Sequence, residues 1–530
     1  MRGKLQCSVI LLVVLCLLTS HRNSAENVLM FHMPSFYSHW LIFAEIGQAL
    51  VDKGHSITVV LPKDLEETRR TERPDFSFES FQDNGTGARI NELIEYYLSM
   101  AGQASQSVFH TLEAGIDMTG TMTKHCDLLL RDSTLVSRLR AQQYSVAITD
   151  PLYPCGALMA AHIDVGLPNI AVMRYDLYFQ DVKATGVPLP LSYVASVETD
   201  FTDQMTFLQR LQNVGLYSIT HVARRWMASS VYDGVAREFL GEGETTLGVM
   251  SRTTLWLYQT DLVLDFPRPT MPDMVQVGGL NVREAAPLPE DLEAFMQSSG
   301  EDGVAVVSFG TVVQNMSPEQ LEVFTTALAR LRQKVVWRYV GEKPPGLGNN
   351  TKLMKWLPQN DLLGHPKTKV FINHAGYNGV CEALYHGVPM VCLPQFGDHP
   401  GNAAQVVARG LGVKLDIGTV TTDQLYQAIL RVLYNNSYRE TAARLSRLHR
   451  DQPQSPMERA VWWIEHVIKH GRLPHLRARA VELPFYQYYL LDVVAFLLAV
   501  CTAVLGAVWC SCSFMCRKCC CKSDRKLKSQ

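Results

Sequence analysis

Residues 354–402 combine an aromatic side chain, glycines, histidines and carboxylates in an order that suits the binding of a ligand. Trp356 offers a flat aromatic face, and the run from His374 to Asn378 follows an apolar stretch that is typical of a strand. A helix that begins near Gly376 would direct backbone N–H groups and the positive end of its dipole at an anion. Glycine at that point lets the backbone approach the anion closely. The pattern therefore predicts a site for a ligand that combines an aromatic base with phosphates.

The same segment also supplies groups that suit hydroxyls. Glu382 lies one helical turn after Asn378, so it can face the same ligand and accept hydrogen bonds from ribose hydroxyls. Asp398 and His399 follow the next predicted strand. Each residue alone has a simpler explanation, such as a buried tryptophan or a capping asparagine. The ordered set is much more specific, and it favours a nucleotide diphosphate sugar as the ligand.

This stretch closely resembles the signature of the membrane-bound UDP-glycosyltransferases, and of the vertebrate glucuronosyltransferase group in particular. The resemblance covers nearly the whole chain. It implies an α/β fold of the GT-B type, in which two Rossmann-like domains face each other across a cleft, plus one C-terminal transmembrane helix. The implied division is an acceptor-binding domain at 26–277 and a UDP-sugar-binding domain at 278–480. The Pro-rich stretch 266–272 would link them.

The resemblance also implies roles for individual residues. Trp356 would stack on uracil, Gln359 and Arg338 would contact the uridine, and Glu382 would hold the ribose. The expected UDP-sugar-binding set is Ser308, Gly310, Thr311, Arg338, Trp356, Gln359, His374, Gly376, Asn378, Gly379, Glu382, Asp398 and His399. Two departures from the family pattern stand out, because Ala375 replaces a usual glycine and His399 replaces a commoner glutamine.

A histidine and an aspartate follow two apolar runs in the amino-terminal half. Ser38 is a credible N-cap for a helix at 38–51, which would place His39 in the first turn, just beyond the strand 27–33. Asp150 ends another predicted strand, and the surrounding segments resemble the catalytic histidine and aspartate segments of the family. The pair predicts general-base catalysis, in which His39 removes the acceptor's proton and Asp150 orients the imidazole. Direct attack would invert the α-linked donor to a β-glycoside.

Composition is consistent with an enzyme of this kind. A chain of 530 residues exceeds a single hydrophobic core, so two domains are expected. A formal charge of −2 gives no basic field for nucleic acid, which we exclude as a partner. The sequence has no D-x-D motif, and we expect neither a metal nor any other cofactor, the UDP-sugar being a co-substrate.

Both ends of the chain carry targeting patterns. Residues 1–25 have the basic start, short apolar run and polar exit of a signal peptide. Residues 491–516 are long and apolar enough for a transmembrane helix, and the basic tail 517–530 predicts a cytosolic end and a lumenal body. Lys526 and Lys528 form a K-x-K-x-x ending that resembles an endoplasmic-reticulum retrieval signal. A plain stop-transfer cluster is the alternative.

Cysteines do not indicate a disulfide scaffold. Only Cys126, Cys155, Cys381 and Cys392 lie in the lumenal body, so one bridge could form, and the pairing stays open. The cysteines of the tail fit S-acylation beside a membrane better than a metal site.

Acceptor and donor are less well defined by the sequence. The region 181–238 could line an apolar acceptor pocket, lie on the membrane surface or form core. The primary hypothesis is transfer of glucuronic acid to phenols, steroids or xenobiotics. Gln259 stands where glucuronosyl enzymes usually have arginine. At position 399 the chain resembles family members that use galactose, because it has a histidine there. A neutral hexose donor is therefore the alternative. A non-catalytic membrane binding protein is a third hypothesis, and a homo- or hetero-oligomer stays open.

Overall fold

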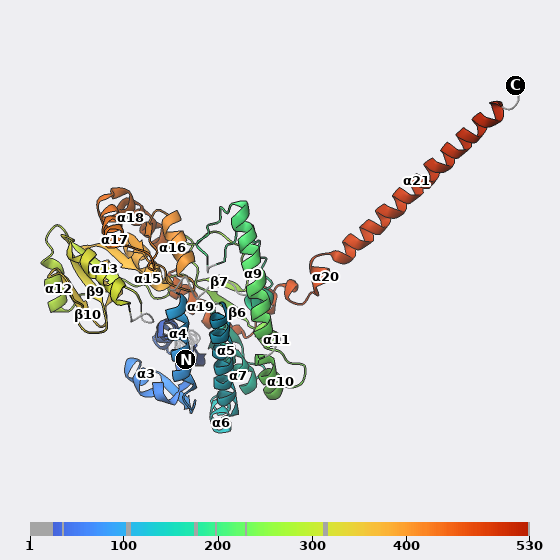
Figure 1. The fold of residues 1–530 in the computed structure, drawn as a ribbon. Coiled ribbons are helices and arrows are strands. Elements are labelled where there is room, and N and C mark those ends of the chain that lie inside the picture. The colour runs from blue at the N-terminus through green and yellow to red at the C-terminus, as the bar shows by residue number, and fades with distance from the viewer. Residues whose placement is uncertain are drawn as a thin grey trace, which may run out of the picture. The chain divides into compact units, whose positions relative to one another are not determined.

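The computed structural model describes residues 25–33, 37–101, 108–173, 179–196, 199–227, 231–310 and 316–527. The described chain divides into two units, one that ends at Arg477 and one that begins at Ala478. The first unit contains two parallel β-sheets with helices around them (Figure 1). The expected signal peptide and Thr311 lie outside the described residues.

The first sheet has seven parallel strands in the order β3-β2-β1-β4-β5-β6-β7. Its strands are β1 Asn27–Phe31, β2 Ser56–Pro62, β3 Ser77–Phe81, β4 Val146–Thr149, β5 Asn169–Met173, β6 Leu255–Tyr258 and β7 Met274–Gln276. The central strands are almost continuously apolar, as expected when helices cover both faces.

Helices connect these strands. They are α2 Tyr37–Val51, η1 Lys63–Leu65, α3 Glu66–Glu72, α4 Thr86–Ala101, α5 Val108–Arg131, α6 Ser133–Ala141, α7 Cys155–Ile163, α8 Phe179–Thr185, α9 Phe207–Met227, α10 Asp233–Leu240 and α11 Thr246–Met250. The prediction that Ser38 caps α2 is wrong, because the helix already includes Tyr37 and Ser38 lies inside its first turn.

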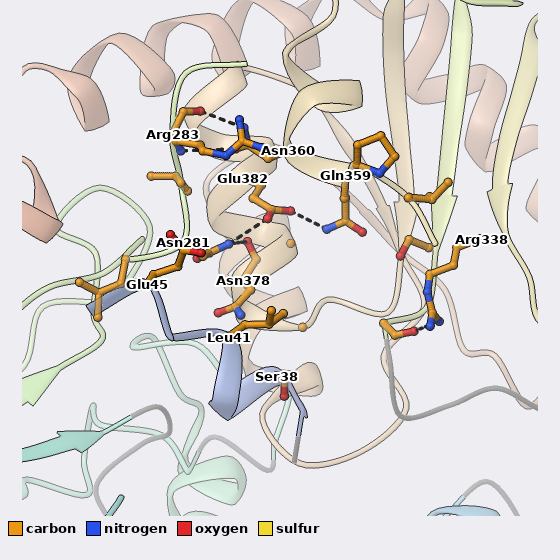
Figure 2. A pocket seen from close by; sticks show the side chains of 18 of the residues that line it. Ser38, Leu41, Glu45, Asn281, Arg283, Arg338, Gln359, Asn360, Asn378 and Glu382 are labelled. Atoms are coloured by element: carbon orange, nitrogen blue, oxygen red, sulfur yellow. Dashed lines mark hydrogen bonds between the residues drawn. The ribbon is translucent and has the colours of Figure 1, made fainter. Parts of the chain in front are cut away.

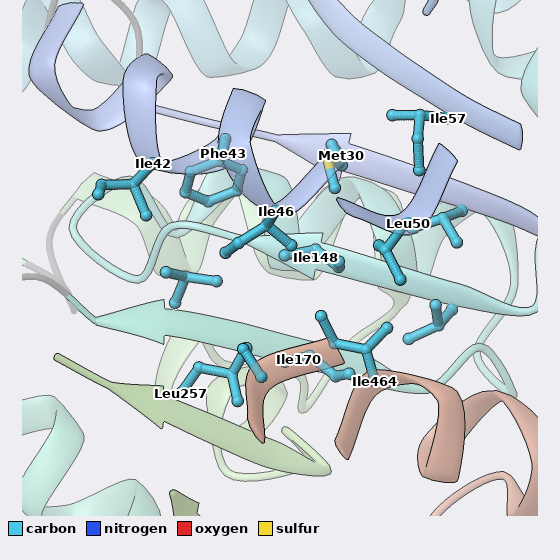
Figure 3. Packing of buried hydrophobic residues seen from close by; sticks show 14 of the residues in the cluster. Met30, Ile42, Phe43, Ile46, Leu50, Ile57, Ile148, Ile170, Leu257 and Ile464 are labelled. Carbon is cyan, nitrogen blue, oxygen red and sulfur yellow. The ribbon is translucent and has the colours of Figure 1, made fainter. Parts of the chain in front are cut away.

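The core of the first sheet lies between the strands and the apolar side of α2 (Figure 3). Ile46 and Leu50 pack over the strands there. The helix α19, Pro456–His470, adds Ala460, Ile464 and Val467 to the same cluster. Their spacing of three and four residues forms one apolar helical stripe. The chain therefore returns from the second sheet to complete the core of the first.

The second sheet has six parallel strands in the order β10-β9-β8-β11-β12-β13. Its strands are β8 Val304–Ser308, β9 Lys334–Arg338, β10 Thr351–Met354, β11 Thr368–Asn373, β12 Met390–Cys392 and β13 Gly412–Lys414. Its helices are α12 Glu290–Gln297, α13 Pro318–Ala329, α14 Gln359–Gly364, α15 Tyr377–His386, α16 His399–Ala408, α17 Thr422–Tyr434 and α18 Asn436–Arg450. After α19, η3 Pro474–Leu476 completes the first unit.

Strand order places the chemically important loops together. β8 and β11 are neighbours at the centre of the second sheet, with Ser308 paired in register with Asn373. The loops that follow both strands therefore leave the same carboxyl edge, where open parallel sheets bind their ligands. In the first sheet, β1 and β4 are neighbours, with Phe31 opposite Thr149. That pairing brings the segments that carry His39 and Asp150 to one edge.

A disulfide joins Cys126 on α5 to Cys155 at the start of α7. Both cysteines are buried within a core cluster on the other face of the first sheet. Cys381 and Cys392 are buried free thiols in the second sheet's domain. Sequence alone left this pairing open.

The second unit contains η4 Arg479–Val481, α20 Phe485–Tyr488 and the long helix α21 Leu491–Leu527. Within the described part of the chain, the stretch Leu491–Lys518 is the one helix long and apolar enough to cross a membrane.

Candidate active site

A cavity of about 550 Å³ lies between α2 and the carboxyl edge of the second sheet (Figure 2). Every expected UDP-sugar-binding residue that the structure describes lines it: Ser308, Gly310, Arg338, Trp356, Gln359, His374, Gly376, Asn378, Gly379, Glu382, Asp398 and His399. These residues come from separate strand ends, loops and helices between positions 308 and 399. Thr311 falls outside the described residues.

The imidazole of His374 explains two of the glycines. A Cβ at Gly310 would lie 2.7 Å from His374 Nε2, and a Cβ at Gly376 would collide with the same ring. Gly310 also has a φ of +75°, which side chains rarely adopt. Any larger residue at either position would displace His374 from the cavity. Gly376 then caps α15, whose first N–H groups and positive dipole end meet the cavity.

Ala375 adopts a left-handed conformation, with φ of 61°. This is the position where the family usually has glycine, and an alanine there carries a strain of roughly 1–2 kcal/mol. Two hydrogen bonds hold the turn. The Ala375 N–H donates to Asn373 Oδ1 at 2.6 Å, and Asn402 Nδ2 donates to the Ala375 carbonyl at 3.0 Å. The two bonds therefore stabilise a left-handed turn that carries an alanine.

Glu382 is held between two amides (Figure 2). Gln359 Nε2 donates to one carboxylate oxygen at 2.5 Å, and Asn281 Nδ2 donates to the other at 3.0 Å. Asn281 also donates to the Asn378 carbonyl at 3.3 Å. Burial raises the pKa of Glu382 to about 7, and the hydrogen bonds from the two amides oppose that rise. The carboxylate is thus fixed in direction at the cavity wall.

Trp356 presents an open aromatic face at the cavity, since 52% of its surface is exposed. The guanidinium carbon of Arg338 lies 5.8 Å from its ring, and Arg338 also donates to the Gly310 carbonyl. Tyr37, from the first turn of α2, meets the tryptophan edge-to-face at 5.9 Å. A planar base can stack here in the same way as bases stack on aromatic side chains elsewhere.

His399 lines the large cavity, whereas Gln259 does not. The His399 ring is 4.5 Å from the His374 ring inside the cavity. Gln259 is buried, 4% exposed, and does not line this cavity. Its neighbours Tyr258 and Thr260 line a smaller cavity of about 70 Å³, which shares Asp398 with the first.

His39 and Asp150 meet at the carboxyl edge of the first sheet, as the strand pairing requires. His39 Nδ1 lies 2.5 Å from Asp150 Oδ2, and each residue is 2% exposed. The other carboxylate oxygen accepts from the Leu152 N–H at 3.0 Å. Ser38 and Leu41, on either side of His39, line the large cavity. The pair therefore sits immediately behind that wall.

A second buried pair of the same chemistry lies elsewhere. His449 Nδ1 is 2.6 Å from Asp261 Oδ2, and both side chains are 1% exposed. Asp261 also accepts from the N–H groups of Val263 and Leu264. None of these residues lines either cavity. This pair ties the linker that leaves β6 to the end of α18.

Several lining residues were not expected from the sequence: Leu41, Glu45, Gln48, Asp52, Asn281, Arg283, Asn360 and Met457. Those on α2 recur every three or four residues, so helical periodicity from Ser38 would have found them. Asn281 gives no comparable signal, because its partner Glu382 is distant in sequence.

Among the described residues, no group of three or more His, Cys, Asp or Glu side chains is placed to hold a metal ion. The expectation of a metal-independent reaction stays a prediction.

Solved structures similar to this fold include two glycosyltransferases. The glycotransferase of kitacinnamycin matches with a TM-score of 0.57 at 20% identity, covering 83% of this chain and 98% of that chain. A variant of Os79 from O. sativa, solved in complex with UDP, matches with a TM-score of 0.57 at 17% identity. The match covers 83% of this chain and 100% of that chain. Two facing Rossmann-like domains and the cavity between them define a GT-B glycosyltransferase fold, as the sequence predicted.

The family assignment rests on sequence. Residues 27–526 match the family described as UDP-glucoronosyl and UDP-glucosyl transferase. UDP-glucuronosyltransferase 2C1 of Oryctolagus cuniculus is 39% identical over 508 residues, 93% of this chain and 99% of that protein. UDP-glucuronosyltransferase 1-2 of Rattus norvegicus is 38% identical over 518 residues, which cover 96% of this chain and 94% of that protein. The chain belongs to this family of UDP-sugar-dependent transferases.

Proposed function

We propose that the protein transfers glucuronic acid from UDP-glucuronate to a hydroxyl group of small lipophilic acceptors, such as phenols, steroids and xenobiotics, and forms β-glucuronides. The observation that carries this proposal is the cavity in which all the described donor-site residues meet, with a buried His39–Asp150 pair behind its wall. The relatives named as glucuronosyltransferases support the choice of donor.

The residues that line the cavity can bind the nucleotide part of the donor. The uracil stacks on Trp356, Gln359 and Arg338 contact the uridine, and the ribose hydroxyls donate to Glu382. The diphosphate lies at the start of α15, where backbone N–H groups and the helix dipole stabilise negative charge. The same groups stabilise the charge that grows on UDP as it leaves.

The acceptor is activated by the histidine pair. His39 takes the proton from the acceptor hydroxyl as its oxygen attacks the anomeric carbon of the sugar. Asp150 fixes the imidazole through Nδ1, so that Nε2 is the basic atom, and it stabilises the cation that forms. In-line attack opposite the leaving UDP inverts the linkage. The domain 26–277 supplies this acceptor side and the domain 278–480 the donor side, with α19 returning to cover the first sheet.

A neutral hexose, galactose or glucose, transferred to a lipid or steroid acceptor is the second candidate. It is favoured by Gln259, which carries no charge to pair with a glucuronate carboxylate and lies outside the cavity lining. His399 lines the cavity beside Asp398 and can serve either donor. As a cation it would pair a carboxylate, and as a neutral ring it would bond a hydroxyl.

We also propose that α21 anchors the protein in the endoplasmic-reticulum membrane as a single-pass type I protein with a lumenal body. The buried disulfide Cys126–Cys155 supports an oxidising compartment. The sequence has N-x-S/T glycosylation motifs at Asn84, Asn315, Asn349 and Asn435. Asn84, Asn349 and Asn435 are exposed, as lumenal glycosylation requires, whereas Asn315 lies outside the described residues.

A microsomal assay tests the proposal. UDP-glucuronate, UDP-glucose and UDP-galactose compete at a fixed concentration of a phenol or steroid acceptor, and the products are identified by mass. A preference for UDP-glucuronate that His39→Ala abolishes, with UDP binding retained, is the expected result. A preference for a neutral hexose would replace the primary donor by the second candidate. Turnover that survives His39→Ala would overturn the assignment of the base.

A further inference from the structure

The first turn of helix α2 contacts both domains. Tyr37 is the first residue of the helix, and His39 follows two positions later. At about 100° per residue, two side chains at this spacing leave the helix on nearly opposite sides. His39 meets Asp150 in the first sheet's domain, with Nδ1 2.5 Å from the carboxylate. Tyr37 meets Trp356, which follows β10 of the second sheet, with ring centroids 5.9 Å apart and ring planes at 85°. One helical turn therefore joins the His–Asp pair to the tryptophan of the donor site.

Tyr37 does not itself line the donor cavity. Its neighbour Ser38 and its partner Trp356 both do. The edge of the tyrosine ring leaves 52% of the Trp356 surface exposed, so a planar base can still stack there. Tyr37 would therefore influence the reaction through the residues that it contacts.

Helix α3 also holds the tyrosine ring. The guanidinium carbon of Arg69 lies 4.9 Å from the centroid of the Tyr37 ring and 5.2 Å from that of the Trp40 ring. Arg69 is buried, and its Nη1 donates to both carboxylate oxygens of Glu72, at 3.0 Å and 2.9 Å. Glu72 also accepts from Trp40 Nε1 at 2.7 Å, whereas the Tyr37 hydroxyl donates to it over 3.4 Å. An arginine and a tryptophan thus fix the ring of Tyr37, and its hydroxyl adds only a long hydrogen bond.

We propose that Tyr37 is a positioning residue for the general base. Its ring, packed on Trp356, holds the first turn of α2 and with it the imidazole of His39 beside the donor cavity. The inference rests on the proposed function, in which uracil stacks on Trp356 and His39 takes the acceptor's proton. Uracil that stacks on the tryptophan restricts the same ring that Tyr37 contacts, so a bound donor also steadies His39.

The size of the effect follows from the geometry that proton transfer needs. A general base works at hydrogen-bond distance from the proton that it removes. Without the ring contact, Asp150 and the rest of α2 alone hold His39. A displacement of about 1 Å costs about 10²-fold in rate, so we expect Tyr37→Ala to lower kcat about 30-fold. UDP affinity, measured as an inhibition constant, should stay within about threefold of wild type, because Tyr37 does not line the cavity.

Steady-state kinetics of the full-length enzyme in microsomes test the inference with two acceptors, a nitrophenol and a steroid alcohol. The donor is the UDP-sugar that wild type prefers. The nitrophenol is acidic and needs little help from a base, whereas the alcohol needs much more. Tyr37→Ala should therefore lower kcat with the alcohol at least about fivefold more than with the nitrophenol. Partial unfolding of the enzyme would lower both rates by one factor.

Two variants separate the ring contact from packing. Tyr37→Phe keeps the ring and should keep kcat within about twofold of wild type. Val51→Ala is the matched control, because Val51 is a partly buried residue at the other end of α2 that packs on the same core and does not line the cavity. It should lower the temperature of inactivation, yet leave kcat per folded molecule and the ratio between the two acceptors unchanged.

A double-mutant cycle tests whether Tyr37 acts through Trp356. The value of kcat/KM for the donor is measured for Tyr37→Ala, Trp356→Ala and the double variant, so that weak donor binding does not prevent the comparison. Tyr37→Ala should lower kcat/KM about tenfold or more in wild type, but less than about threefold when the tryptophan is already absent.

The opposing results are distinct. Equal losses with both acceptors, or a profile like that of Val51→Ala, would refute a role in positioning the base. Weaker UDP affinity with unchanged kcat would refute it too, because Tyr37 would then serve donor binding alone. Additive losses in the cycle would exclude the contact with Trp356 as the cause, and a Tyr37→Phe variant as slow as Tyr37→Ala would exclude the ring. Full turnover by His39→Ala would overturn the proposed function and this inference with it, whereas normal turnover by Tyr37→Ala beside an inactive His39→Ala would refute this inference alone.

Discussion

The two buried His–Asp pairs allow the catalytic assignment to be tested within one chain. His39–Asp150 and His449–Asp261 have Nδ1–Oδ2 distances of 2.5 Å and 2.6 Å, and all four side chains are at most 2% exposed. Only the first pair lies behind the cavity wall. Asp150→Asn and Asp261→Asn therefore remove the same charge from the same geometry at two places, and only one of them should affect turnover.

The expected magnitudes follow from burial. Water cannot replace either carboxylate, so each substitution leaves a histidine without its charged partner and should cost about 3 kcal/mol or more of stability. For Asp150→Asn there is a second effect, because the amide can hold the imidazole in the wrong tautomer. That should lower kcat about 10⁴-fold, or raise the barrier by about 5 kcal/mol. Asp261→Asn should leave kcat per folded molecule within about threefold, since its histidine touches no reacting group.

The assay measures kcat under saturating UDP-glucuronate and acceptor, with the folded fraction determined from UDP binding, and Tm for each variant. Similar losses of Tm with a kcat loss confined to Asp150→Asn support the assignment. If Asp261→Asn lowered kcat as much as Asp150→Asn, the effect would be structural, and the role of Asp150 in orienting a base would be refuted.

The further predictions concern the donor site and topology. Asn281→Leu should reduce the preference for UDP over 2′-deoxy-UDP about tenfold in competition binding, because Glu382 loses one of its two amide donors; an unchanged preference would contradict this. UDP affinity should weaken as pH falls through about 7, the pKa of Glu382, and Glu382→Gln should reduce that slope in calorimetry; the slope that remains comes from the terminal phosphate of UDP, whose second pKa is about 6. Because this folded-state pKa lies above the ordinary value of 4.5, Glu382 favours unfolding increasingly as pH rises from about 4.5 to 7, so Glu382→Gln should flatten Tm in that window. His399→Gln should shift the donor preference between UDP-glucuronate and the neutral UDP-hexoses by about tenfold if the ring contacts the sugar, as donor competition would reveal. Changing Lys526 and Lys528 to serine should let part of the protein leave the endoplasmic reticulum, and glycosidase should shift its mobility; no shift, with a protease-sensitive body in sealed microsomes, would refute a lumenal orientation.

The parts of the fold that sequence could predict are those that depend on neighbouring residues. The run from Val370 to Asn378 predicted a strand, a turn and a helix start, and the structure has β11, Gly376 as the cap and α15. The motif order also placed the donor-site residues on loops at strand ends. Parallel pairing of β8 and β11 then brings those loops together, as the α/β pattern requires.

Contacts between residues far apart in the chain could not be predicted from local sequence patterns. Asn281 and Glu382 are 101 residues apart, and His449 and Asp261 are 188 apart, so nothing local marks either contact. Helix α19 packs in the core of the first sheet, although it follows the second sheet in the chain, so no local pattern marks that contact. The start of α2 was misjudged because Ser38 has the residue type of a cap, whereas the helix already includes Tyr37.

The two His–Asp pairs show why residue type and geometry do not by themselves identify a catalytic site. Both pairs have the short contact and the burial that a triad-like arrangement needs, and both lie at the edge of a domain. What separates them is access. Ser38 and Leu41, beside His39, line the large cavity that holds the donor-site residues, whereas Thr260, beside Asp261, lines only the cavity of about 70 Å³. A general base must reach a substrate proton, so we propose that the pair beside the large cavity is the catalytic one.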